Sequence, residues 1–133
     1  KAFCAADPDG CKFVVDFGAY DSIMTSNSYN FIQMGFHGLL LEPTPESFAE
    51  SRLSLNQFIS VANSHNQEQQ GNKPKQIVHL VHGAINLLDR EAYVVSREHS
   101  GAANRIVNGA QEAGEGNTVT KVKSYTPKSL FEE

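Results

Sequence analysis

The sequence predicts an α/β fold in which helices flank a mostly parallel sheet. Three short apolar runs, residues 12–18, 37–43 and 77–85, have the composition of buried strands, and each meets a glycine or an acid near its end. Segments with helix start signals separate the first two runs from each other and from the third. This alternation implies right-handed crossovers and a parallel sheet with helices on its faces.

The first strand is predicted within residues 12–18, and a loop of small and polar residues follows it. A helix is predicted within residues 26–36, because Ser26 or Asn27 can serve as its N-cap and Gly35 is placed to end it. The second strand, residues 37–43, then carries three consecutive leucines as its buried run.

A second helix is predicted for residues 44–58. Thr44 can cap it, Pro45 suits its first turn, and Glu46 complements the positive end of the helix dipole. The almost wholly polar segment 63–76 is predicted to be a surface loop that leads to the third strand.

The character of the chain changes after the third strand. Residues 92–96 form a short strand candidate, and the glycine-containing segment 97–117 reads as loop. Residues 118–125 are rich in β-forming residues, so a further strand is predicted there. A last helix is predicted for residues 126–133, with Thr126 as its cap.

The composition is that of one globular domain. The chain has 133 residues, of which 40% are hydrophobic and 20% are charged. Its net charge is -4 and its lysines and arginines do not cluster, which argues against a nucleic-acid partner. No run approaches the roughly 18 apolar residues of a membrane-spanning helix, so the sequence predicts a soluble protein.

Residues 1–11 are predicted to be an N-terminal extension of a domain that takes residues 12–133. Cys4 and Cys11 flank an Asp-Pro-Asp-Gly turn, so both a disulfide across a small loop and two free thiols stay open. The chain starts at Lys1 and not at a methionine, so we expect it to have been processed, trimmed or taken from a longer product. Removal of a targeting peptide would suit an organellar or secreted location.

Two acids and a glycine stand at the ends of the first two predicted strands. Asp16 and Gly18 close the first strand, and Glu42 closes the second. Ligands of α/β sheets bind beyond the C-terminal ends of the strands, where a glycine lets the backbone approach them closely. An acid at the second strand's end can hold the ribose hydroxyls of an adenosine ligand. We therefore expect a nucleoside site here, and the alternative for Glu42 is a helix-capping or solvated acid.

Two stretches resemble the start of the FkbM-type methyltransferase domain. Residues 15–22, Val-Asp-Phe-Gly-Ala-Tyr-Asp-Ser, are similar to the family's Val-Asp-x-Gly-Ala-x-Asp-Gly opening. Residues 26–28, Ser-Asn-Ser, and 42–45, Glu-Pro-Thr-Pro, are similar to its Ser-Asn-Thr and Glu-Pro-x-Pro segments. Looser similarities to its third strand, its Ser-Gly loop and its Thr-Leu-Asp-Asp-Leu-Leu segment follow at residues 81–85, 100–101 and 125–133.

The resemblance implies a partial Rossmann-like class I fold that binds S-adenosylmethionine. It implies methyl transfer, usually to a hydroxyl oxygen, so that a small molecule or a glycan would be the acceptor. It assigns no catalytic residue and no metal. By position, it places Asp16, Gly18, Ala19 and Asp21 at the methionine end of the cofactor, Ser26 and Asn27 nearby, Glu42 at the ribose, and Ala84 and Ile85 near the adenine.

Two departures from the family bear on activity. Ser22 stands where the family has glycine, and serine is less free to take a positive φ. The family's next strand, roughly Asp-x-x-x-Ile-Asp-x-Glu-Gly, supplies acids beside the methyl donor, and the 133 residues do not reach it. The domain is therefore expected to be incomplete. The alternative function is a non-catalytic accessory or structural subunit, a pseudoenzyme whose protein partners cover the exposed sheet edge.

The five histidines do not predict a metal site. His79 and His82 are three apart in a predicted strand, so their side chains point to opposite faces. His99 lies beside the Ser-Gly pair at residues 100–101, which makes it the best histidine candidate for a catalytic base. The competing interpretation of His99 is an exposed loop residue.

Overall fold

The computed structural model describes residues 12–20, 22–24, 26–69, 76–88, 90–97, 105–114 and 117–132, and for residues 61–69, 97 and 113 it describes the backbone alone. The extension at residues 1–11, with both cysteines, and the region of His99 therefore lie outside the described residues. In chain order the elements are β1 (Phe13–Phe17), α1 (Tyr29–Gln33), β2 (His37–Glu42), α2 (Pro45–Gln69), β3 (Val78–His82), β4 (Ala84–Ile85), β5 (Glu91–Arg97), β6 (Arg105–Val107), the 3-10 helix η1 (Ala110–Ala113), β7 (Asn117–Tyr125) and α3 (Pro127–Glu132).

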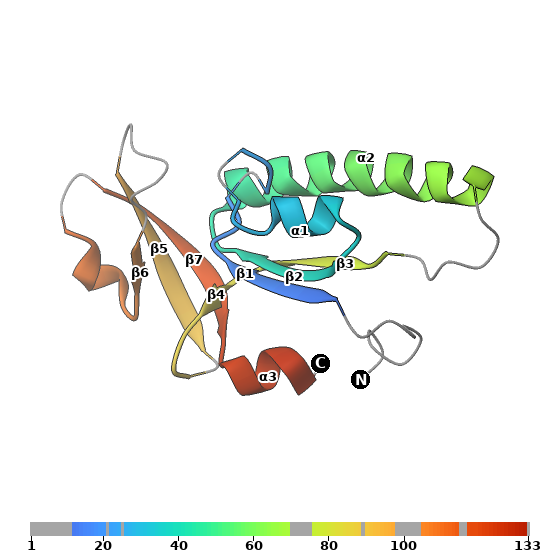
Figure 1. Ribbon diagram of the computed structural model, residues 1–133. Helices are drawn as coiled ribbons and strands as arrows, with labels where there is room; N and C mark the ends of the chain where they lie inside the picture. Colours follow the sequence, from blue (N-terminus) through green and yellow to red (C-terminus); the bar gives the residue numbers. More distant parts are fainter. Residues whose placement is uncertain are drawn as a thin grey trace.

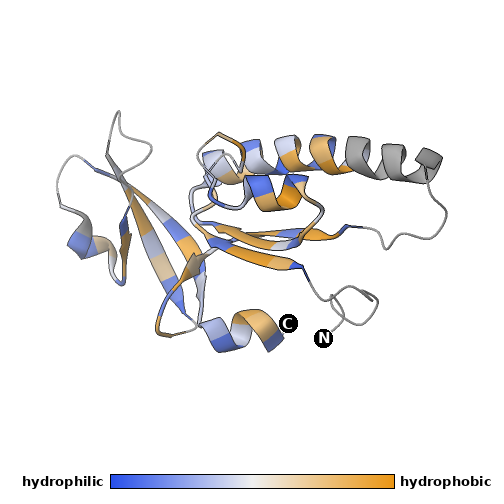
Figure 2. Ribbon diagram, viewed as in Figure 1, coloured by the Kyte–Doolittle hydropathy of each residue, from blue (hydrophilic) through white to orange (hydrophobic). Residues whose placement is uncertain are grey.

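The first half of the chain forms a parallel sheet in the order β1-β2-β3. Helices α1 and α2 cover one face of this sheet, and α3 lies on the other side (Figure 1). Every residue of β2 is buried, and the three strands are apolar along most of their length (Figure 2). The predicted α/β class is confirmed, and the predicted parallel sheet is present in this half of the chain.

Side chains of β2 alternate between two apolar layers, because successive residues of a strand point to opposite faces. Leu40 packs with Leu55 of α2 in the layer below the first two helices. Leu41 packs with Leu130 of α3 and Tyr125 of β7 in the layer on the opposite face. The central strand therefore holds both helical layers against the sheet.

The second half of the chain builds a mixed sheet in the order β4-β7-β5-β6. Strand β5 pairs antiparallel with both β7 and β6, whereas β4 pairs parallel with β7. Strand β4 begins directly after β3, with Gly83 between them, so one stretch of chain passes from the first sheet into the second. In this part polar and apolar residues alternate more than in the first sheet (Figure 2).

The ends of α1 and α2 differ from the predictions. Ser28, and not Ser26 or Asn27, is the N-cap of α1, and no side-chain capping bond forms there. The hydroxyl of Ser26 instead donates to Asp16, so a tertiary contact takes the place of the predicted cap. Gly35 does follow the helix end, with φ of 88°.

Helix α2 runs through residues 63–69, which the sequence predicted to be loop, so that part of the prediction was wrong. The segment lacks an apolar stripe, but its glutamines and glutamate are good helix formers, and no glycine or proline interrupts it before Gly71. The loop predicted for residues 97–117 was also wrong in part, because it contains β6 and η1. Thr126 does cap α3, since its Oγ1 accepts the N–H of Ser129 at 3.1 Å.

No helix of the described residues is both long and apolar enough to cross a membrane.

Gly83 allows the two sheets to approach each other. A Cβ at this position would lie 2.6 Å from Cε2 of Tyr125 and 3.0 Å from the backbone oxygen of Lys123. We expect Gly83→Ala to lower the free energy of unfolding by about 1–3 kcal/mol, because overpacking forces neighbours off their preferred positions. Urea denaturation followed by circular dichroism measures this change.

Gly109→Ala is the matched control for that substitution. Its Cβ would meet the flexible end of the Gln111 side chain, and its φ of -144° is open to any residue. The control should stay within about 0.5 kcal/mol of the wild-type chain. Equal effects of the two substitutions would contradict the role given to Gly83.

Candidate functional site

The carboxyl ends of β1 and β2 lie side by side because the two strands run parallel in register. Asp16 is opposite Leu40, and Phe17 is opposite Leu41. The N–H groups of Gly18 and Ala19 both donate to the Leu41 oxygen, at 2.8 and 3.0 Å. These bonds turn the chain at the sheet edge and bring the first loop next to Glu42.

Gly18 presents bare backbone at this edge. Its φ is 84°, in the left-handed region that favours glycine. A Cβ built at Gly18 would have no described heavy atom within 4 Å beyond its chain neighbours, so the turn faces open space. Close approach of a ligand to the backbone is therefore possible here.

Asp16 is buried, with 8% of its surface exposed. Its Oδ2 accepts hydrogen bonds from the hydroxyls of Ser26, at 3.1 Å, and Ser28, at 2.9 Å. The two serine hydroxyls also lie 2.8 Å apart. Asp16 thus fixes the segment that leads into α1, and this is a structural use of an acid that the sequence assigned to the ligand.

Glu42 is also buried, and both of its carboxylate oxygens accept backbone N–H groups. Oε2 accepts from Tyr20 at 2.8 Å, and Oε1 accepts from Thr44 at 2.8 Å. The second bond joins Glu42 to the start of α2, which is the helix-capping type of contact left open by the sequence. Each carboxylate oxygen has a second acceptor position, so these bonds do not exhaust the group.

The loop after β1 is bound to α2 through Ser51, a residue that no sequence motif predicted. Tyr20 and Ser22 have φ values of 49° and 59°. The hydroxyl of Ser22 donates to Oγ of Ser51 at 2.9 Å, and the Ser51 hydroxyl donates to the Tyr20 carbonyl oxygen. A sequence signal existed, since Ser47 and Ser51 lie one turn apart on the buried face of α2.

Two further predicted site residues, Ala19 and Asn27, are placed less favourably. Ala19 is fully buried in the core with Leu40, so only its backbone can face a ligand. Asn27 is exposed in the segment before α1, and Asp21 lies outside the described residues.

Ala84 and Ile85, predicted near the adenine, belong to β4. Ala84 is buried among Ala92, Val94 and Val122, and Ile85 packs against the apolar layer that contains α3. Strand β2 lies between β1 and the strand that leads into β4. These two side chains therefore contribute to the protein's own core.

His82 stacks on Phe48 with ring centroids 4.8 Å apart, and its Nε2 lies 3.2 Å from the Pro43 oxygen. In the part of the chain that the structure describes, no group of three or more His, Cys, Asp or Glu residues is arranged to hold a metal ion.

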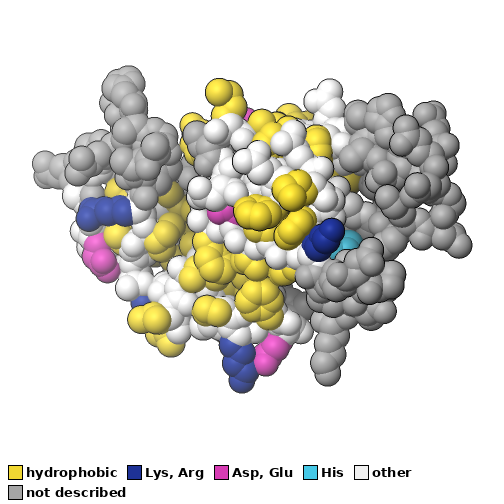
Figure 3. All heavy atoms as spheres, in the orientation of Figure 1, with side chains coloured by type: hydrophobic (Ala, Val, Ile, Leu, Met, Phe, Trp, Pro, Cys, Tyr) yellow, Lys and Arg dark blue, Asp and Glu magenta, His cyan; other side chains and the backbone are white. Residues whose placement is uncertain are grey.

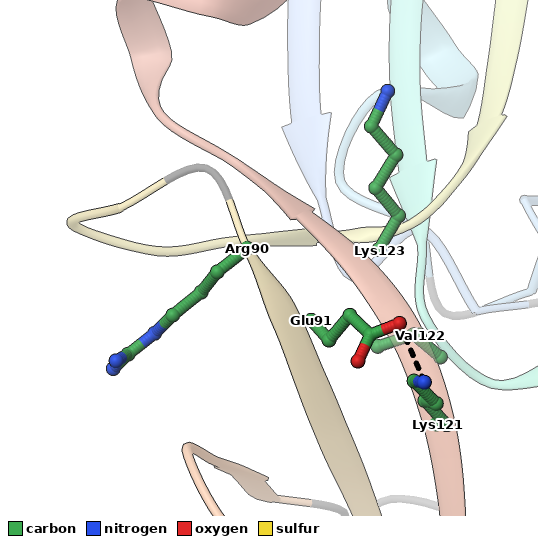
Figure 4. Close-up of a pocket in the computed structure, with 5 residues that line it drawn as sticks. All are labelled: Arg90, Glu91, Lys121, Val122 and Lys123. Carbon is green, nitrogen blue, oxygen red and sulfur yellow. Dashed lines mark ion pairs between the residues drawn. The ribbon is translucent and has the colours of Figure 1, made fainter.

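An open recess of about 470 Å³ lies on the second sheet, lined by Arg90, Glu91, Lys121, Val122 and Lys123 (Figure 4). Lys121 pairs with Glu91 at 2.5 Å, and this hydrogen bond raises the pKa of Lys121 above its usual 10.5. Lys123 lies 4.4 Å from the ring centroid of Tyr125. Arg90 points away from the other labelled side chains (Figure 4). The cations diverge, so the recess does not present a common binding point.

Comparison with known proteins found no match among protein-family models, curated proteins or solved structures. The resemblance to FkbM-type domains therefore stays a prediction, based on the short motifs at residues 15–22, 26–28 and 42–45.

Ser28→Ala tests the contact between Asp16 and the segment before α1. Ser28 is 1% exposed and donates to the Asp16 carboxyl, so its loss leaves a buried acceptor with one partner fewer. We expect the free energy of unfolding to fall by about 1–3 kcal/mol in thermal or urea denaturation. The neighbouring exposed substitution Asn27→Ala should change it by less than about 0.5 kcal/mol. An effect of Ser28→Ala no larger than this control would show that the contact is dispensable.

Proposed function

We propose that this chain binds S-adenosylmethionine at the carboxyl ends of β1 and β2, as a methyltransferase-like domain of the FkbM type. The observation that carries the proposal is the open backbone of Gly18 beside the carboxylate of Glu42. This pairing of an unobstructed glycine turn with an acid on the next strand suits a ligand that contains ribose. The motif at residues 15–22 supports the choice of S-adenosylmethionine over other nucleosides.

The strand order supports the same proposal. Read from β3 to β1, the sheet has the order 3-2-1, which corresponds to the first half of a Rossmann sheet. In that fold the strand order reverses next to the first strand, and ligands bind outside the carboxyl ends at that point. Gly18 is at the carboxyl end of β1, so in a Rossmann-type sheet it would lie beside that ligand position.

The protein groups have separable tasks in this proposal. The second acceptor positions of the Glu42 oxygens would take the ribose hydroxyls, while the first positions keep Tyr20 and Thr44 in place. The backbone at Gly18 would lie against the methionine end of the ligand. When bound, S-adenosylmethionine supplies an electrophilic methyl group for a hydroxyl oxygen of a small molecule or a glycan. The protein's contribution would be alignment of the reacting atoms and exclusion of water.

A second candidate function is an accessory or structural subunit that retains the first half of the fold without catalysis. The open edge of β1 favours it, because in the described residues β1 has β2 as its one sheet neighbour. Phe17 at the end of β1 is 51% exposed, and Phe131 of α3 is 58% exposed. Figure 3 shows hydrophobic side chains gathered over β1 and beside α3 on this face. Such an edge is a surface that soluble proteins usually cover.

Isothermal titration calorimetry with S-adenosylmethionine and S-adenosylhomocysteine tests the proposal. We expect the wild-type chain to bind both, and Glu42→Gln to weaken binding roughly tenfold or more, because a charge-assisted hydrogen bond to the ribose is lost. Glu50→Gln on the exposed face of α2 is the matched control and should bind like the wild-type chain. Circular dichroism verifies that each variant is folded.

The possible results separate the two candidate functions. Absence of heat with the folded wild-type chain would contradict cofactor binding and favour the accessory subunit. Undiminished affinity in Glu42→Gln would contradict the ribose contact, while the carboxyl ends of β1 and β2 would remain the proposed binding place.

A further inference from the structure

The loop after β1 holds two residues with side chains in the left-handed region. Tyr20 has a φ of 49° and Ser22 a φ of 59°. Residues other than glycine rarely adopt this conformation, because Cβ crowds the following carbonyl oxygen. The surrounding structure must therefore hold both residues in place.

Ser51 is the side chain that contacts both ends of this strained segment. It lies in α2, is fully buried, and accepts the hydroxyl proton of Ser22 at 2.9 Å. Its own hydroxyl donates to the Tyr20 carbonyl oxygen. One hydroxyl on a rigid helix thus fixes Tyr20 and Ser22 relative to each other.

The same segment is joined to the candidate ligand acid. The Tyr20 N–H donates to Oε2 of Glu42 at 2.8 Å, so the backbone of Tyr20 is held by Glu42 on one side and by Ser51 on the other. A shift of this segment would move the N–H group that orients the Glu42 carboxylate. Through Tyr20, Ser51 therefore affects the position of the Glu42 carboxylate, at which the ligand is proposed to bind.

We infer that Ser51 is a positioning residue, which keeps the loop and the Glu42 carboxylate in the arrangement that the adenosyl ligand requires. The affinity part of this inference rests on the proposed function. The geometry also explains how a serine occupies position 22, where glycine would take the left-handed conformation at little cost. The hydrogen bond between the Ser22 and Ser51 hydroxyls offsets the strain that the Ser22 side chain, unlike a glycine, brings to this conformation.

Substitutions at positions 51 and 22 test whether the Ser51 hydroxyl compensates for the strain at Ser22. Ser51→Ala removes both hydrogen bonds, so the loop amides of Tyr20 and Ser22 should exchange with solvent roughly tenfold faster. Amides of β2, such as that of Leu40, should keep their wild-type rates. The affinity for S-adenosylhomocysteine should fall by a similar factor of about ten.

Ser22→Gly in the Ser51→Ala background should restore slow exchange and affinity toward the wild-type values, because glycine adopts the positive φ without support. Ser47→Ala is the matched control, since it makes the same change at a buried position one turn earlier on α2. It should alter neither the loop exchange nor the affinity. Additive effects of the Ser51 and Ser22 substitutions, with no rescue, would overturn the compensation.

Two readouts keep this inference separate from the proposed function. The amide exchange rates of Tyr20 and Ser22 report how firmly the loop is held, and they are measured without any ligand. Loop exchange in Ser51→Ala equal to that in Ser47→Ala would overturn the positioning role, whatever the affinity. A wild-type chain that fails to bind S-adenosylhomocysteine would overturn the proposed function and with it the affinity part of this inference. Faster loop exchange in Ser51→Ala that is reversed by Ser22→Gly would still support the conclusion that Ser51 fixes the loop.

Discussion

The arrangement of the loops at the carboxyl ends of β1 and β2 depends on a buried carboxylate at the end of β2, the central strand. A buried acid must find hydrogen-bond partners, or its desolvation opposes folding. Glu42 finds them in the N–H groups of Tyr20 and Thr44, and its own backbone oxygen accepts the N–H of Gly83 at 3.2 Å. The first loop, the start of α2 and the passage between the two sheets therefore all meet at one residue.

This convergence links stability to binding. The carboxylate that would hold a ribose also holds the protein's own loop, so a ligand must use the acceptor positions that remain or displace a backbone contact. Tyr20 and Ser22 stay in the left-handed region only while their partners remain in place. Strain that surrounding contacts maintain is a common feature of binding sites, and the partners here come from β2 and α2.

Much of the fold followed from apolar runs and helix signals, whereas the contacts of the site did not. The run of three leucines before Glu42 predicted the central strand, and Thr44 with Pro45 predicted the start of α2. The end of α2 was missed because polar helix formers carry no periodic stripe. The sequence placed Asp16 and Glu42 at the ends of neighbouring strands and left open a capping role for Glu42 at the start of α2. It could not show the bonds of Asp16 to Ser26 and Ser28 or of Glu42 to Tyr20, since these partners lie ten or more residues away in the chain.

The two candidate functions use the same half-sheet, but the first requires a ligand at the carboxyl ends of β1 and β2, whereas the second requires a partner along the open side of β1. In a Rossmann-type crevice, the carboxyl ends of the first two strands contact the nucleoside, while groups beyond the first strand complete the other wall. In the proposed function, Gly18 and Glu42 would supply the first set of contacts. Methyl transfer additionally needs an acceptor held in line with the donor, and β1 has β2 as its one described neighbour. In the proposed function, cofactor binding and catalysis would therefore be physically separable, because the first requires β1 and β2 while the second requires structure on the open side of β1.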